Sequence, residues 1–175
     1  MRPGDRREST DAMIRVDQAG EYGATRIYAG QLAILGDRHP ASRAISHMAH
    51  QEERHRAFFD RLIVERGARP TLLQPFWHVA GFALGAVTAA IGPEAAMACT
   101  AAVETEIDKH YQQQLDQLGE SDLELSGAIA EFQAEELEHR DHAIAHAAES
   151  TFGYPVLSGL IRLGCKVAIA AAKRI

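Results

Sequence analysis

Two short stretches decide the fold: QEERH at residues 51–55 and EELEH at residues 135–139. Each contains a Glu-x-x-His motif. Residues three apart lie on the same face of an α-helix, so each motif can bind one metal ion through a carboxylate oxygen and an imidazole nitrogen. The candidate ligands in the two stretches are Glu52, His55, Glu136 and His139.

A lone glutamate precedes each motif at almost the same distance. Glu21 lies 31 residues before Glu52, and Glu104 lies 32 residues before Glu136. The chain thus repeats a pattern in which one helix carries a single Glu and the next carries Glu-x-x-His. Ferritin-like di-metal bundles use this ligand set. The sequence therefore predicts an all-α fold, a ferritin-like four-helix bundle with an additional apolar crossover helix and a C-terminal helix.

Other carboxylates lie on the same helices, and the apolar periodicity selects among them. Glu104 follows the apolar Met97 at helical spacing, whereas Glu106 is followed by Lys109 and Gln113. We therefore expect Glu104 to face inward and Glu106 to lie on a polar face. Buried carboxylates without partners would cost several kcal/mol each, and two divalent cations with two imidazoles remove that cost. The alternative is that all these residues lie on solvated helix faces.

Composition excludes several other classes of protein. The chain has 175 residues, a net charge of −6 and no dense Lys/Arg run, so we expect no nucleic-acid binding. Its length fits a single domain, residues 1–175. Cys99 and Cys165 form no C-x-x-C pair, which argues against a thiolate zinc or iron site. The polar N-terminus lacks the apolar core of a secretory signal, so we expect a bacterial chain or a mature form without its presequence.

Helical periodicity extends over most of the chain, and no strand is expected. A capping-box pattern, Ser121 with Glu124 three residues on, predicts the start of the fourth helix. The expected helices cover about 11–35, 40–66, 93–119, 121–149 and 155–175.

The segment 70–93, PTLLQPFWHVAGFALGAVTAAIGP, contains no Asp, Glu, Lys or Arg. Its length is near the roughly 20 residues that span a bilayer, but Gln74 and Pro75 interrupt it and leave only about 79–91 as a continuous apolar helix. We therefore expect a membrane- or partner-docking helix, with a buried crossover helix and a transmembrane helix as alternatives. In the last helix, basic residues are placed for anionic lipid, namely Arg162, Lys166, Lys173 and Arg174.

Six stretches of the chain form a pattern that is more specific than Glu-x-x-His alone: MIRVDQAGEYGATRIYAGQ (13–31), QEERH (51–55), RPTLLQPFWHVAGFALGAVTAAIG (69–92), AMACTAAVETEIDKHY (96–111), EELEH (135–139) and GCKVAI (164–169). In these stretches the chain resembles the demethoxyubiquinone hydroxylase family of ubiquinone biosynthesis, and the resemblance covers nearly its whole length. Gln18 stands where His is common in that family, outside the six candidate ligands.

This resemblance implies an O2-dependent monooxygenase that hydroxylates the ring of demethoxyubiquinol. Electrons would come from an external reductant, NADH or the quinol, because the chain has no G-x-G-x-x-G motif. His110 and Tyr111 match a His-Tyr pair of the family and are implied to act near the site, although packed core residues are the alternative. The implied ligands of two iron ions are Glu21, Glu52, His55, Glu104, Glu136 and His139.

The resemblance also implies where the protein acts and with what. Its substrate would be a polyprenyl demethoxyubiquinol, so we expect peripheral attachment to a membrane surface. That surface would be the cytoplasmic face of a bacterial inner membrane, or the matrix side of the mitochondrial inner membrane. Other proteins of ubiquinone biosynthesis and a second copy of the chain are further candidate partners.

Two other functions fit the same residues. A ferritin-like iron-oxidising or peroxide-reducing protein would use the same six ligands, and manganese would bind them as well as iron. A non-catalytic lipid-binding scaffold would instead keep its function when Glu136 is replaced. A separate iron domain with four cysteines, usual in rubrerythrins, is absent from the sequence.

Overall fold

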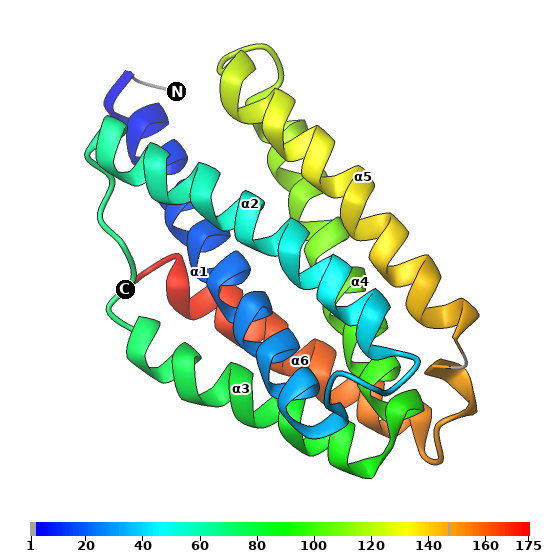
Figure 1. Ribbon diagram of the computed structural model, residues 1–175. Coiled ribbons are helices and arrows are strands. Elements are labelled where there is room, and N and C mark those ends of the chain that lie inside the picture. Colours follow the sequence, from blue (N-terminus) through cyan, green and yellow to red (C-terminus); the bar gives the residue numbers. More distant parts are fainter. Residues whose placement is uncertain (1–2, 147) are drawn as a thin grey trace. The chain divides into compact units, whose positions relative to one another are not determined.

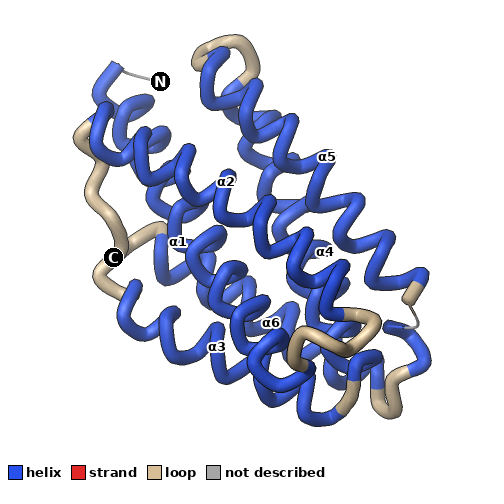
Figure 2. Tube along the Cα trace, in the orientation of Figure 1, coloured by secondary structure: helices blue, strands red, loops and turns tan. Residues whose placement is uncertain are grey.

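The protein is described by a computed structural model covering residues 3–146 and 148–175. This part of the chain contains six α-helices and no strand, which confirms the predicted all-α, ferritin-like fold class (Figure 1). Figure 2 shows that only short loops join the helices. The helices are α1 (Pro3–Leu35), α2 (Ser42–Arg66), α3 (Gln74–Ile91), α4 (Pro93–Leu118), α5 (Leu123–Ala145) and α6 (Tyr154–Ala172), with a short 3-10 helix η1 (Ala148–Ser150).

These helices group into two compact units. The first, unit 1, comprises Met1–Ala90 and Val167–Ile175, and unit 2 comprises Ile91–Lys166. Unit 1 thus holds α1, α2, nearly all of α3 and the end of α6. Unit 2 holds α4, α5, η1 and the first part of α6.

In unit 1, α1 and α2 form a helical hairpin. Gly36 takes a positive φ of 70° at the turn, and the Ser42 hydroxyl donates to the carbonyl of Gly36 at 2.6 Å. The helix α1 begins at Pro3, eight residues before the predicted start, because the polar segment 3–10 has no apolar period but is compatible with helix. The core between the two helices is made by large buried side chains, including Ile14, Tyr28, Ile45, Phe59 and Leu62.

The third helix of unit 1, α3, packs against α1 with almost no side chain between the backbones. A Cβ atom on Gly81 would lie 2.9 Å from the carbonyl oxygen of Gly23, and a Cβ atom on Gly85 would overlap the carbonyl of Ile27. The G-x-x-x-G pattern of α3 therefore serves a close contact within the chain. On the other side of α3, Phe76 is exposed, so the segment is partly a packed crossover helix and partly an exposed apolar surface.

In unit 2, α4 and α5 form a second hairpin. Pro93 begins α4, which agrees with the predicted start of this helix, and proline is favoured in the first helical turn. The predicted cap of α5 is wrong: the Asp122 carboxylate accepts from the backbone N–H of Leu125 at 3.1 Å, whereas the Ser121 hydroxyl donates to Leu118 O. The predicted end of α5 near residue 149 is also too late, because the helix stops at Ala145 and η1 follows.

By length and composition alone, α6 is the one helix among the described residues that could cross a membrane. Little of it is buried, and its exposed apolar side chains recur at helical spacing. The helix α3 does not meet the same criteria of length and apolar composition. The transmembrane alternative for residues 70–93 therefore gains no support. The exposed stripe on α6 consists of Val156, Leu160, Leu163 and Val167.

Candidate metal centre

Unit 1 brings together the three candidate ligands of the first sequence repeat. Glu21 comes from α1, and Glu52 and His55 come from α2 one helical turn apart. Nδ1 of His55 lies 3.4 Å from Oε2 of Glu21 and 4.0 Å from Oε2 of Glu52. One ligand atom from each residue falls within 4.8 Å of the others, and none of the three side chains is more than 4% exposed. We call this cluster the first half-site.

Unit 2 brings together the corresponding residues of the second repeat. Glu104 comes from α4, and Glu136 and His139 come from α5. Nδ1 of His139 lies 3.0 Å from Oε2 of Glu136. The ligand atoms of these three residues also fall within 4.8 Å of one another, and all three side chains are buried. We call this cluster the second half-site.

Each half-site therefore holds two carboxylates and one imidazole in a buried position. Buried carboxylates are stable when they are paired with positive charge or bound to a cation. Oxygen and nitrogen donors in this ratio suit iron or manganese, and no thiolate belongs to either cluster. The donor set thus fits the predicted metals, and the ligand role of the six residues stays a prediction.

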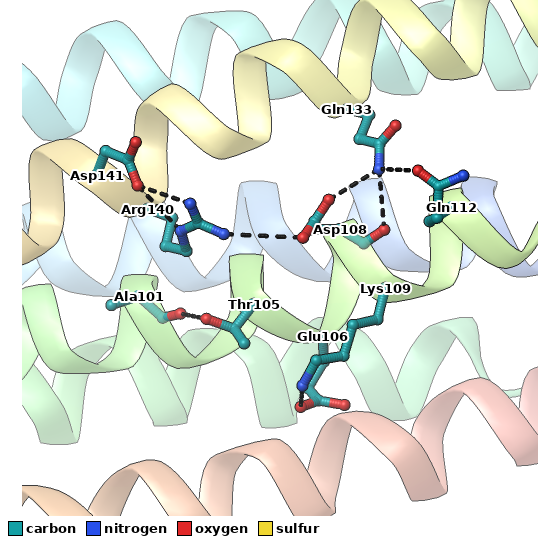
Figure 3. Close-up of polar contacts among 9 residues, drawn as sticks. All are labelled: Ala101, Thr105, Glu106, Asp108, Lys109, Gln112, Gln133, Arg140 and Asp141. Atoms are coloured by element: carbon teal, nitrogen blue, oxygen red, sulfur yellow. Dashed lines mark hydrogen bonds and ion pairs between the residues drawn. The ribbon is translucent and has the colours of Figure 1, made fainter.

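Polar contacts of Asp108 with Gln133 and Arg140 join α4 to α5 (Figure 3). The Gln133 amide donates to Oδ1 of Asp108 at 2.8 Å, and Arg140 lies 3.7 Å from Oδ2 of the same carboxylate. Gln133 and Arg140 flank Glu136 and His139 along α5. These contacts therefore hold α5 in one rotational setting relative to α4.

In unit 1, Gln18 makes an equivalent link between helices. Its side-chain amide donates to Oδ1 of Asp60 at 2.9 Å and so joins α1 to α2. Asp60 is also 3.6 Å from the Arg56 guanidinium. The sequence pattern identified Gln18 only as a departure from the resembled family, because its partner lies 42 residues away.

His110 and Tyr111, the two further candidates, lie on α4 and are both buried. The amide nitrogen of Gln114 lies 3.0 Å from Nε2 of His110, within hydrogen-bonding distance. Tyr111 follows Glu104 by two helical turns on the same helix. Their placement is compatible with a role near the second half-site, and that role stays a prediction.

The expectation that Glu106 lies on a polar, solvated face is wrong. Its side chain is only 4% exposed, and its Oε1 accepts from Nε of Arg162 at 2.6 Å and from Nζ of Lys109 at 3.1 Å. Nζ of Lys166 lies 3.8 Å from the other carboxylate oxygen. Burial acts to raise the pKa of Glu106, but the bonds from Arg162 and Lys109 outweigh it and hold the pKa below its ordinary value.

The basic residues of α6 are therefore only in part available to lipid. Arg162 and Lys166 are paired with Glu106, whereas Lys173 and Arg174 are exposed beyond the end of the helix. On the same stretch of α6, burial raises the pKa of the Cys165 thiol to about 12, and the Glu104 and Glu106 carboxylates add to the rise. The thiol thus stays protonated at neutral pH.

The chain is similar over nearly its whole length to several known proteins. The family model described as "Ubiquinone biosynthesis protein COQ7" matches residues 8–172. The 3-demethoxyubiquinol 3-hydroxylase of Rhodospirillum rubrum is 54% identical over 175 residues, which cover 99% of this chain and 82% of that protein. The NADPH-dependent 3-demethoxyubiquinone 3-hydroxylase, mitochondrial, of Bos taurus is 50% identical, with 97% of this chain and 79% of that protein covered. The 5-demethoxyubiquinone hydroxylase, mitochondrial, of Saccharomyces cerevisiae is 44% identical, with 94% and 78% covered.

Proposed function

The chain belongs to the family of the ubiquinone biosynthesis protein COQ7, and from that membership we propose that it is a 3-demethoxyubiquinol 3-hydroxylase. The enzyme is an O2-dependent monooxygenase of ubiquinone (coenzyme Q) biosynthesis. The observation that carries the proposal is the presence of two buried clusters, each with two carboxylates and one imidazole. A non-catalytic helical protein would have no reason to bury these charged groups twice in the same pattern.

We propose that the two half-sites together hold two iron ions and that the two units act as one di-iron domain. Neither half-site alone has more than three protein ligands, whereas ferritin-like di-metal centres use six. When bound, the iron pair would activate O2 and pass electrons to it. The six proposed ligands are Glu21, Glu52 and His55 from unit 1, with Glu104, Glu136 and His139 from unit 2.

The protein itself supplies orientation and a water-poor surrounding. The Asp108 contacts hold α5 so that Glu136 and His139 keep their places beside Glu104. Nε2 of His110 lies 3.0 Å from the amide nitrogen of Gln114, which fixes the orientation of the imidazole ring on α4. We place His110 and Tyr111 as the groups that move protons near the reacting oxygen.

An external reductant completes the reaction. Insertion of one oxygen atom from O2 into a ring C–H bond yields C–OH and water, and this requires two electrons and two protons. The chain has no nucleotide-binding G-x-G-x-x-G motif. Several relatives are named NADPH-dependent, which supports a reduced nicotinamide as donor, with the quinol as the second candidate.

A membrane surface is the proposed location, because a polyprenyl quinol resides in lipid. Exposed apolar residues on α3 and on α6 support it, with Phe76 60% and Val156 67% exposed. Lys173 and Arg174 add positive charge at the end of α6, suited to anionic headgroups. The surface would be the cytoplasmic face of a bacterial inner membrane, or the matrix side in mitochondria, where several relatives are named mitochondrial.

The test is anaerobic loading of the protein with ferrous iron, followed by a short-chain demethoxyubiquinol, a reductant and ¹⁸O2. We expect about two irons per chain and a product whose ring gains one labelled oxygen, read by mass spectrometry. Glu136→Ala should abolish the product. Glu138→Ala, which changes an exposed carboxylate on the same helix, is the matched control and should leave it unchanged.

The other outcomes separate the alternative functions. Two bound irons that are oxidised without any quinol product would contradict the hydroxylase and favour an iron-oxidising or peroxide-reducing protein. Absence of iron binding, with lipid binding intact in Glu136→Ala, would contradict the metal centre and favour a lipid-binding scaffold.

A further inference from the structure

The first part of α6 is joined to α4 by a cluster of charges, in which a buried carboxylate contacts partly exposed cations. Glu106 on α4 is the only carboxylate in this cluster among the described residues, and it contacts three cations. Lys109 belongs to its own helix, whereas Arg162 and Lys166 reach it from α6, one helical turn apart. The 2.6 Å bond from Nε of Arg162 is the shortest of these contacts and joins residues 56 positions apart in the chain.

Apolar packing contributes little to this attachment. Between Tyr154 and Lys166, only Ser158 and Ile161 are buried. Three larger apolar side chains of the same stretch are exposed, namely Val156, Leu160 and Leu163. Since apolar stabilisation scales with the area removed from water, the ion cluster carries an unusually large share of what holds α6 to α4.

The attachment lies two residues from a proposed metal ligand on the same helix. Glu104, the proposed ligand, is 2% exposed, and Glu106 is the residue that binds α6. Residues two apart on a helix point to different sides, so α6 contacts α4 at Glu106 and not at Glu104. The stretch from Arg162 to Lys166 therefore supports the helix that carries Glu104.

We propose that Glu106 is a positioning residue: by binding Arg162 it holds the first part of α6 against α4, the helix that carries Glu104. Its effect on catalysis rests on the hydroxylase function proposed above, whereas its effect on α6 does not. Lys109 keeps a charge partner on Glu106 when α6 moves, so loss of Arg162 frees α6 and leaves α4 intact.

The experiment measures how fast iodoacetamide alkylates Cys165 in the folded full-length chain, with Cys99 resolved by peptide mass spectrometry. In Arg162→Met we expect about a tenfold faster reaction, because local opening exposes the thiol. Arg162→Lys keeps the charge and should stay within about threefold of the wild type. Arg140→Met removes an ion pair between α4 and α5 that does not touch α6, and it should leave the rate unchanged.

Whether the alkylation rate of Cys165 rises or falls in Arg162→Met distinguishes movement of α6 from a purely electrostatic effect on the thiol. Removing the Arg162 cation disfavours the thiolate of Cys165, so an electrostatic effect alone would slow alkylation. A faster reaction therefore reports movement of α6. Equal or slower alkylation in Arg162→Met would overturn the proposal, and so would an Arg140→Met rate as fast as that of Arg162→Met.

A second readout connects α6 to the reaction. In iron-loaded protein, the ratio of hydroxylated quinol to O2 consumed should fall several-fold in Arg162→Met and recover in Arg162→Lys, because α4 then holds Glu104 less firmly in place. An unchanged ratio would overturn the positioning role of Glu106 in the reaction. If no variant, the wild type included, forms product, the proposed function fails while the alkylation result still decides the attachment of α6.

Discussion

The two half-sites carry the same residue types, yet the helices that support them are held in different ways. In unit 1, the Glu21 helix is backed by α3, and the contact is made by glycines that bring two backbones together. In unit 2, the Glu104 helix is backed by α6, and the contact is made by a buried carboxylate with cations. One support depends on shape and the other depends on charge.

This difference has physical consequences. A backbone contact at glycine tolerates no added atom, and the contact itself depends less on salt and pH than an ion cluster does, although a hydrogen bond between Tyr22 and His78 also joins α1 to α3. An ion cluster tolerates a change of side-chain length but depends on protonation and ionic strength. The two units therefore share a ligand pattern but need not be stabilised in the same way. Unit 1 should respond mainly to an added side-chain atom, and unit 2 mainly to changes in pH and ionic strength.

The largest expected effect comes from breaking the ligand pattern at equivalent positions. Glu52→Ala and Glu136→Ala should each reduce product formation by at least about 100-fold, above the 10–100-fold loss typical of residues that only support a ligand. Iron content, measured by plasma emission, should fall in both. A variant that keeps its iron and activity in one half-site alone would show that the two repeats are not equivalent in function.

The next effect is steric and confined to unit 1. Gly85→Ala places a methyl group against the carbonyl of Ile27, and overpacking of this kind costs about 1–3 kcal/mol or more. We expect a lower free energy of unfolding by urea titration and loss of iron from the first half-site.

A matched substitution in α6 controls for the loss of glycine itself. An added Cβ on Gly159 meets no atom within 4 Å, so Gly159→Ala should be neutral or stabilising by up to about 1 kcal/mol. Equal destabilisation by Gly85→Ala and Gly159→Ala would contradict the distinction between a close-packed α3 and a loosely packed α6.

The sequence predicts the six candidate ligands because the signal is local and repeated. Glu-x-x-His needs only one helical turn, and the lone glutamates recur at nearly equal spacing along the chain. The fold class follows from the same pattern together with helical periodicity, and the structure confirms it. Helix ends are less well predicted, as Asp122 shows by capping α5 in place of Ser121.

What the sequence does not predict is the pairing of distant elements. Glu106 looks solvated because Lys109, three residues on, is a sufficient local partner, and its second partner Arg162 lies 56 residues away. Arg162 looks placed for lipid because it stands on an otherwise apolar helix. The glycines of α3 indicate a close contact, but only the structure identifies α1 as the other side of it.

High salt should have a smaller effect, and it should weaken the attachment of α6 in unit 2 more than that of α3 in unit 1. Raising ionic strength to about 1 M shortens the Debye length to about 3 Å and weakens partly exposed ion pairs. We expect amide hydrogen exchange in residues 154–166 to become about twofold faster, while residues 74–91 are unaffected. Arg162→Met should lose this salt response. A salt response of α3 equal to that of α6 would contradict the comparison.

The smallest effect concerns alkaline pH and acts only in unit 2. Because the folded pKa of Cys165 is raised to about 12, folding favours its protonated form. The associated stability is fully present below the ordinary thiol pKa of about 8.5 and is lost as pH rises from there toward 12, by at most about 1.4 kcal/mol per pH unit.

Other groups titrate in the same range, so the measured quantity is the difference in unfolding free energy between wild type and Cys165→Ala. That difference should be constant below about pH 8.5 and should shift in favour of Cys165→Ala above it, because alanine has no proton to lose. A difference that stays flat to pH 11 would mean that α6 opens enough to solvate the thiolate, in which case the charge-based support of unit 2 is weaker than its geometry indicates.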